Sequence, residues 1–176
     1  MTKKTITQFT FSDEEKYLFN TIANCATELG YPCYIVGGYV RDKILQRSYK
    51  KDIDFVCVGS GITLARKVAA VLPGNPFVAE FKNFGTAHFK YHDIDVEFVG
   101  ARKESYVKES RNPIVENGTL ADDQLRRDFT INAMAISLNG DDFGALIDPF
   151  DGLTDLEDRI IRTPQNPEIK FSDDPL

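Results

Sequence analysis

Apolar residues in the first part of the chain follow a helical period and then form short strand-like runs. From Phe11 to Leu29 they recur every three or four positions, which predicts an amphipathic helix. Ser12 and Glu15, three residues apart, predict a capping box at its start, and Gly30 predicts its end. We expect this helix to cover one face of a sheet.

A strand, a glycine turn and a short helix are predicted next. Tyr34–Val36 is an apolar, partly β-branched run that stops at Gly37 and Gly38. Consecutive glycines permit backbone angles closed to other residues and let a ligand approach the main chain. Tyr39–Gln46 is expected to form a helix whose first amides face an anion such as a phosphate, with Arg41 available to pair with it.

The strand that follows carries two acids. Asp52 and Asp54 are separated by one residue, so both carboxylates point to the same side, whereas Ile53, Phe55 and Cys57 face the core. Adjacent carboxylates repel each other unless a cation lies between them, and such oxygen ligands suit Mg²⁺ bound together with substrate phosphates. An isolated Asp-x-Asp pair is also typical of a solvated strand edge. The preceding glycine turn and arginine favour the metal-site interpretation.

The remaining pattern predicts further helices and strands, with one long polar loop between them. Gly59–Gly61 is interpreted as a plain strand-to-helix turn because it contains no basic residue. Helical segments are expected at Ile62–Leu72, Thr119–Ile136 and Leu153–Asp158, strands at Phe77–Phe81, Ala87–Tyr91, Ile94–Val99 and Phe143–Phe150, and a mobile surface loop at Arg102–Gly118. This order predicts an α/β (α+β) fold in which a mixed sheet carries helices mainly on one side.

A third carboxylate is available on the strand after the His92–Asp93 turn. Asp95 and Glu97 lie on one face of that strand, so either would extend the acidic site if this strand lies beside the Asp-x-Asp strand. His88 and His92 are four residues apart, but they fall on a strand and its turn. That spacing does not direct both imidazoles at one metal ion.

Two consecutive arginines lie within the predicted helix Thr119–Ile136. On a helix, Arg126 and Arg127 point about 100° apart, which predicts different partners for them. One is expected to clamp a triphosphate and the other to pair with an acid such as Asp122 or Asp123. A surface cluster of salt bridges is the alternative interpretation.

Composition limits the possible classes of protein. The 176 residues suit one domain, or one domain with a short extension. The sequence lacks an apolar run long enough to span a bilayer, and its three cysteines form no Cys-x-x-Cys pair, so we expect no membrane association and a cytoplasmic location. The net charge of −6 argues against tight RNA binding by this chain alone, so most of an RNA-binding surface is expected elsewhere.

Several motifs, in order, resemble one family of enzymes. They are GGYVRD (residues 37–42), DIDF (52–55), RRDFTINAMA (126–135), LIDPFDGLTDLEDRIIRTP (146–164) and FSDDPL (171–176). This set is similar to the nucleotidyltransferases that include bacterial poly(A) polymerases and class II CCA-adding tRNA nucleotidyltransferases. The resemblance implies a polymerase-β-like catalytic head over residues 1–163 and the start of a helical neck at 164–176. It also implies that the sequence is a head cut from a longer protein.

The same resemblance implies roles for individual residues. Asp52, Asp54 and Glu97 would hold two Mg²⁺ ions, and Glu97 is favoured over Asp95 because an arginine, Arg102, follows it five residues later. The residues implied to bind the nucleotide are Gly37, Gly38, Arg41, Arg127, Asp128, Asn132 and Asp174.

The implied reaction is template-independent addition of CCA to the 3′ end of tRNA from CTP and ATP, with release of pyrophosphate. Poly(A) polymerase, which adds AMP to RNA 3′ ends, is the alternative within the enzyme class. CCA addition is favoured because it is the more widespread activity of the family. A non-catalytic nucleotide- or RNA-binding module is the alternative from another class, and the adjacent acids at Asp52 and Asp54 argue against it.

Overall fold

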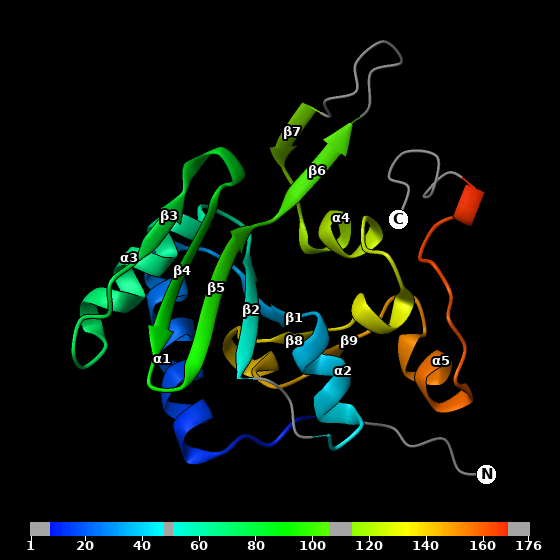
Figure 1. Cartoon of the computed structure of the whole chain (residues 1–176), viewed down its shortest axis with the longest axis horizontal. Helices are drawn as coiled ribbons and strands as arrows, with labels where there is room; N and C mark the ends of the chain where they lie inside the picture. The colour runs from blue at the N-terminus through cyan, green and yellow to red at the C-terminus, as the bar shows by residue number, and fades with distance from the viewer. Residues whose placement is uncertain (1–7, 48–50, 106–113, 169–176) are drawn as a thin grey trace.

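The computed structural model describes residues 8–47, 51–105 and 114–168 of the chain (Figure 1). Its centre is a seven-stranded mixed sheet with the strand order β3-β4-β5-β2-β1-β8-β9, and β6 and β7 form a separate two-stranded sheet. The strands are β1 (Cys33–Val36), β2 (Asp52–Cys57), β3 (Ala79–Phe81), β4 (Thr86–Tyr91), β5 (Ile94–Gly100), β6 (Arg102–Ser105), β7 (Ile114–Asn117), β8 (Ala135–Ser137) and β9 (Leu146–Ile147). The α-helices are α1 (Asp13–Leu29), α2 (Gly38–Ile44), α3 (Gly61–Val71), α4 (Leu120–Leu125) and α5 (Gly152–Asp158). Three 3₁₀ helices are η1 (Lys82–Phe84), η2 (Thr130–Asn132) and η3 (Gly140–Asp142).

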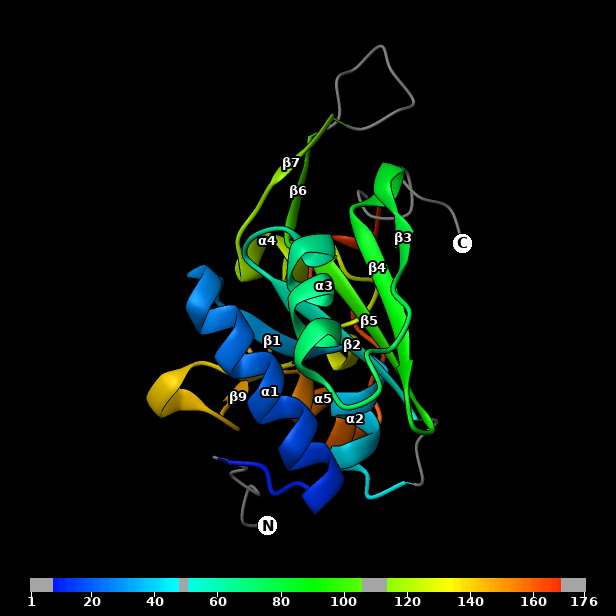
Figure 2. The ribbon, with the colours of Figure 1, turned by 90° about the vertical axis from the view of Figure 1, so that its left-hand side faces the viewer.

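The two longest helices, α1 and α3, cover the same face of the sheet, as Figure 2 shows. The core beneath them is aromatic: Phe55 and Phe98 stack with ring centroids 5.2 Å apart, and Phe19 of α1 packs edge-on against Phe55. The helix α1 begins with the capping box predicted from Ser12 and Glu15. The α/β (α+β) class, with a mixed sheet and helices mainly on one side, is therefore confirmed.

The strands β2 and β5 run parallel at the centre of the sheet, whereas β1 lies antiparallel to β2 on its other side. On the face opposite α1 and α3, a small apolar cluster covers part of β1, β2 and β8. It includes Val36, Val56 and Ala135, against which Leu120 of α4 packs. The N-terminal part of β2, which carries Asp52 and Asp54, lies outside this cluster.

The predicted helix from Thr119 to Ile136 is wrong beyond its first turns. The helix α4 ends at Leu125, Phe129 has extended backbone angles, and Ala135–Ser137 forms β8. The reason is tertiary pairing, because β8 fills the place next to β1, a strand about 100 residues earlier in the chain. Local helical spacing carries no information about that pairing.

Other predictions differ in extent. Part of the predicted loop Arg102–Gly118 forms the paired strands β6 and β7, and residues 106–113 lie outside the described residues. The predicted strand Phe143–Phe150 is reduced to β9, and Phe77–Phe81 to β3. In the described parts of the chain, no helix is both long and apolar enough to cross a membrane.

Candidate active site

Four acids lie on the sheet face opposite α1 and α3. In β2, Asp52 is exposed and Asp54 half-buried, while Ile53 between them is buried, as side-chain alternation predicts. The register of the parallel pair places Asp54 opposite Glu97 and Asp52 opposite Asp95. The strand pairing therefore brings the predicted third carboxylate beside the Asp-x-Asp pair.

Asp54 carries the electrostatic consequence of this arrangement. The pKa of its carboxyl is raised from the usual 3.8 to about 6, chiefly by burial and then by the charges of Glu97 and Asp52, while the charge of Arg127 acts to lower it. A bound cation would offset this cost, and carboxylate oxygens are the ligands that Mg²⁺ prefers. Among the described residues no three His, Cys, Asp or Glu side chains are already arranged to hold a metal ion, so these acids would have to converge on it.

The two rivals for the third carboxylate differ in their neighbours. The Oδ1 atom of Asp95 lies 3.4 Å from the imidazole Nε2 of His88. Glu97 is the register partner of Asp54 and exerts the largest charge effect on the pKa of that carboxyl. These contacts favour Glu97 as the residue that acts together with Asp54.

The glycine turn borders the same space. Gly37 has a φ of +75°, in the region that favours glycine. A Cβ atom at this residue would lie 3.4 Å from Asp54 Oδ2 and 3.5 Å from Arg127 Nη1. The missing side chain therefore leaves open a gap between a carboxylate and a guanidinium, next to the main chain of Gly38.

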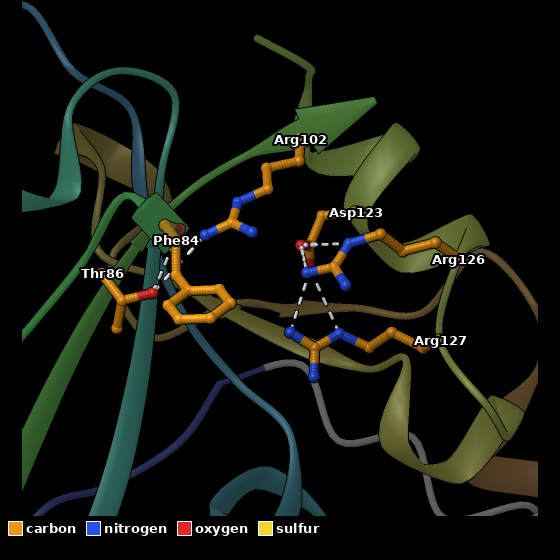
Figure 3. Close-up of polar contacts among 6 residues, drawn as sticks. All are labelled: Phe84, Thr86, Arg102, Asp123, Arg126 and Arg127. Carbon is orange, nitrogen blue, oxygen red and sulfur yellow. Dashed lines mark hydrogen bonds and ion pairs between the residues drawn. The ribbon is translucent and has the colours of Figure 1, made fainter. Parts of the chain in front are cut away.

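Asp123 holds both arginines, as Figure 3 shows. Its fully buried carboxylate accepts bonds from Arg126 through Oδ1 at 2.6 Å and from Arg127 through Oδ2 at 2.9 Å. The predicted pairing of one arginine with an acid such as Asp123 is present, but the expectation that the two arginines have different partners is wrong, because residues three and four positions after Asp123 lie on its side of the helix and both guanidinium groups reach it. The sequence signal for Asp123 was its spacing of three and four residues from the arginines.

A second hydrogen-bonded chain joins α2 to η2. Arg41 donates from Nη1 to Asn132 Oδ1 at 2.8 Å and from Nε to Asp42 at 2.9 Å. Asn132 in turn donates to Asp128 Oδ1 at 3.2 Å, and Asp128 accepts a bond from the Phe129 amide. In this structure these residues bind each other, so their predicted contact with a nucleotide stays a prediction.

The short helix α2 is tied to α1 by a buried acid. Glu15 accepts a hydrogen bond of 2.7 Å from the Tyr39 hydroxyl and an ion pair of 3.2 Å from Lys43. Because the same side chain also closes the capping box of α1, one residue fixes the position of the helix that follows the glycine turn. The sequence predicted the role of Glu15 in the capping box of α1, but not its bonds to Tyr39 and Lys43 of α2.

Two further expectations concern residues away from this space. His92 contacts Glu14 at 2.9 Å, and His88 contacts Asp95, so the histidines have separate acidic partners. Asp174, predicted to help bind the nucleotide, lies outside the described residues.

Comparison with known proteins gives consistent matches. Residues 33–162 match the family described as the poly(A) polymerase head domain. An A-adding tRNA nucleotidyltransferase from Aquifex aeolicus is 47% identical over 143 residues, which are 81% of this chain and 17% of that protein. A solved tRNA nucleotidyltransferase complexed with a primer tRNA and an incoming ATP analog is 42% identical, with a TM-score of 0.74 over 88% of this chain and 41% of that one. A CCA-adding enzyme solved with CTP is 34% identical, with a TM-score of 0.77 over 94% of this chain and 35% of that one.

The chain thus spans between 17% and 41% of the length of these relatives. Their structures share its mixed sheet and helices, which confirms the polymerase-β-like head expected from the sequence. With most of its length matched, the chain belongs to the poly(A) polymerase head-domain family, within the group of class II CCA-adding tRNA nucleotidyltransferases.

Proposed function

We propose that this chain is the catalytic head of a tRNA nucleotidyltransferase that completes the CCA end from CTP and ATP. The observation that carries the proposal is the register of Asp54 with Glu97 beside the Gly37 turn and Arg127. Acids for a cation, a gap next to the main chain and a fixed guanidinium are what the transfer of a nucleotide from a triphosphate requires. The relatives solved with an ATP analog and with CTP support these substrates.

The proposed reaction is an in-line displacement. The 3′-hydroxyl oxygen of the RNA attacks the α-phosphorus of the nucleotide, the bond to pyrophosphate breaks, and the hydroxyl proton leaves to solvent. Arg127, held by Asp123, would pair with the β- and γ-phosphates, and Gly37 leaves room for them beside the main chain. The chain Arg41–Asn132–Asp128 would keep α2 and η2 at a fixed separation.

The three acids Asp52, Asp54 and Glu97 fit two Mg²⁺ ions. Among the described residues, Arg127 is the one cation that acts on the Asp54 carboxylate, and Arg127 is itself paired with Asp123, so the negative charge of the acids is left for metal ions to balance. When bound, such ions would supply Lewis-acid activation of the attacking hydroxyl and neutralise charge on the α-phosphate and pyrophosphate. The division into a head over residues 1–163 and a neck from 164, and a cytoplasmic location, remain part of this proposal.

A second candidate is addition of the terminal A alone. It is favoured by one observation, the 47% identity to a relative named an A-adding enzyme. Both candidates use the same acids and the same nucleotide site, so the geometry of the head supports both. They differ in whether CMP is incorporated.

The test uses the full-length protein, Mg²⁺, and α-labelled CTP and ATP supplied separately and together. The substrates are a tRNA that lacks CCA and a tRNA that ends in CC. CCA addition predicts incorporation that stops after C-C-A, A addition predicts labelling of the CC-ending tRNA with ATP alone, and a long A tail on unrelated RNA would indicate poly(A) polymerase. Loss of incorporation in Asp52→Ala and Asp54→Ala, with the exposed Asp141→Ala as the control, would support the acids. A folded protein that incorporates no nucleotide would overturn the proposal.

A further inference from the structure

A pocket of about 370 Å³ lies at the end of the sheet where β5 passes into β6. Its wall combines the Gly59–Gly61 turn, the η1–β4 junction and the first residues of β6. The side chains that line it include Asn83, Phe84, Arg102 and Asn117. An aromatic face, a cation and two amides around a cavity of this size are suited to one nucleotide, since bases stack on aromatic rings and Arg pairs with phosphates.

The wall of this pocket is built from closely packed main chain. A Cβ at Gly100 would come 2.6 Å from the carbonyl oxygen of Gly59, and a Cβ at Gly61 would come 2.9 Å from that of Phe98. Ser60 caps α3 by accepting a bond from the Thr63 amide, so the turn has the plain structural role predicted for it. These contacts leave no room for a side chain at Gly61 or Gly100, so this part of the pocket wall is formed by the main chain.

Phe84 and Arg102 are placed for contact with a ligand. Phe84 lines the pocket and is 63% exposed, so its ring is open to a ligand there. Arg102 reaches toward it and donates to the Thr86 hydroxyl at 3.5 Å, a long and therefore weak bond, as Figure 3 shows. Among the salt bridges of the described residues Arg102 has none, so its charge is available to a phosphate.

The pocket lies next to the acids, on the β4–β5 side of the sheet. Thr86 is paired with Val99, and His88 with Glu97, so the Thr86–Arg102 contact is one strand repeat, roughly 7 Å, beyond Glu97. In the strand order β4-β5-β2-β1, the pocket lies on the β4–β5 side of the acids, and Gly37 lies on the β1–β2 side. In-line displacement requires the attacking oxygen and the pyrophosphate to be on opposite sides of the α-phosphorus.

We propose that this pocket binds one nucleotide of the single-stranded 3′ end of the RNA primer, with its base stacked on Phe84 and its phosphate paired with Arg102. The proposal rests on the proposed function, because Arg127 and Gly37 must hold the triphosphate for the primer to approach from the pocket. It assigns to this chain an RNA contact despite its net charge of −6.

The test is a comparison of variants in the full-length enzyme, with KM measured separately for the CC-ending tRNA and for ATP. Phe84→Ala and Arg102→Ala are expected to raise the KM for tRNA roughly tenfold and to leave the KM for ATP and the melting temperature unchanged. The matched controls are Phe77→Ala, an 87% exposed phenylalanine outside the pocket, and Lys103→Ala, the exposed neighbour of Arg102; both should stay within about twofold of wild type. An increase in the KM for ATP instead would assign the pocket to the incoming nucleotide and overturn the proposal.

A second measurement tests the stack itself. Primers carrying an abasic nucleotide at each position of the single-stranded end are bound to wild type and to Phe84→Ala, with affinity read by fluorescence anisotropy. At one position the abasic primer should bind both proteins equally, because the interaction that Phe84→Ala removes is already gone. An equal loss for Phe84→Ala with every primer would show that no base stacks there. Since binding requires no turnover, this result is independent of the proposed reaction, whose own failure would appear as a wild-type enzyme that binds RNA but incorporates nothing.

Discussion

Asp54 in β2 and Glu97 in β5 are direct register partners in the parallel strand pair at the centre of the sheet. The charge of Glu97 is the largest effect, after burial, that raises the pKa of the Asp54 carboxyl. Repulsion between these two acids destabilises the folded protein, and a cation bound between them would offset this destabilisation. The pairing is therefore what we would expect of a site selected for binding rather than for stability.

This relationship distinguishes the two candidates for the third carboxylate. Glu97→Gln should lower kcat by more than about 100-fold, beyond the 10- to 100-fold typical for loss of an outer partner of a metal site. Asp95→Asn removes a carboxylate on the same face that contacts His88, and should change kcat by less than about fivefold. Steady-state incorporation of AMP checks both variants, and the reverse order of effects would assign the role to Asp95.

The raised pKa of Asp54 predicts a pH-dependent stability in metal-free protein. With a folded pKa of about 6 against the usual 3.8, the folded state holds the proton more tightly, so stability is greatest below the unfolded pKa and falls as pH rises through about 6. Asp54→Asn stays neutral and should be more stable than wild type by on the order of 1–2 kcal/mol at pH 8, but not at pH 4. Denaturant unfolding in EDTA at both pH values measures the difference.

Magnesium provides the control for that prediction. Addition of Mg²⁺ at pH 8 should raise the stability of the wild type and have little effect on Asp54→Asn, because the ion binds the folded carboxylates. A stability difference that is the same at pH 4 and pH 8 would contradict the electrostatic origin of the effect.

The two arginines on Asp123 should separate in function. Arg127 borders the gap at Gly37, so Arg127→Ala should raise the KM for ATP by at least about tenfold. Arg126→Ala removes an equivalent bond to the same buried carboxylate and should cost about 1–3 kcal/mol of stability with a smaller change in KM. Kinetics and thermal unfolding of the two variants are compared, and equal KM changes would mean that both arginines contact the nucleotide.

The open gap at Gly37 can be tested with a matched glycine. Gly37→Ala places a methyl group between Asp54 and Arg127 and should lower kcat/KM by at least about tenfold. Gly74→Ala also places an alanine at a positive φ, of +84°, but its Cβ would meet nothing within 4 Å. If the two variants lose equal activity, backbone strain rather than occupation of the gap is the cause.

Much of the fold and part of the candidate site were predictable from the sequence. The capping box of Ser12 and Glu15, the shared face of Asp52 and Asp54, and the stop of β1 at Gly37 depend on residues a few positions apart. Side-chain alternation and capping are set by local backbone geometry, so a single sequence reveals them. The motif order then identified the family.

The remaining features of the fold and the site depend on pairing between segments that are far apart in the sequence. Neither the position of β8 beside β1 nor the register of Asp54 with Glu97 follows from local spacing, because both depend on which strands the whole core brings together. The same is true of Arg102, a residue from the predicted loop that the fold carries to the Gly59–Gly61 turn, where the sequence shows no basic residue. The sequence determined which chemical groups this protein has and which way each strand presents them, and the tertiary structure decided which of them meet, because contacts between distant segments are selected by packing of the complete core.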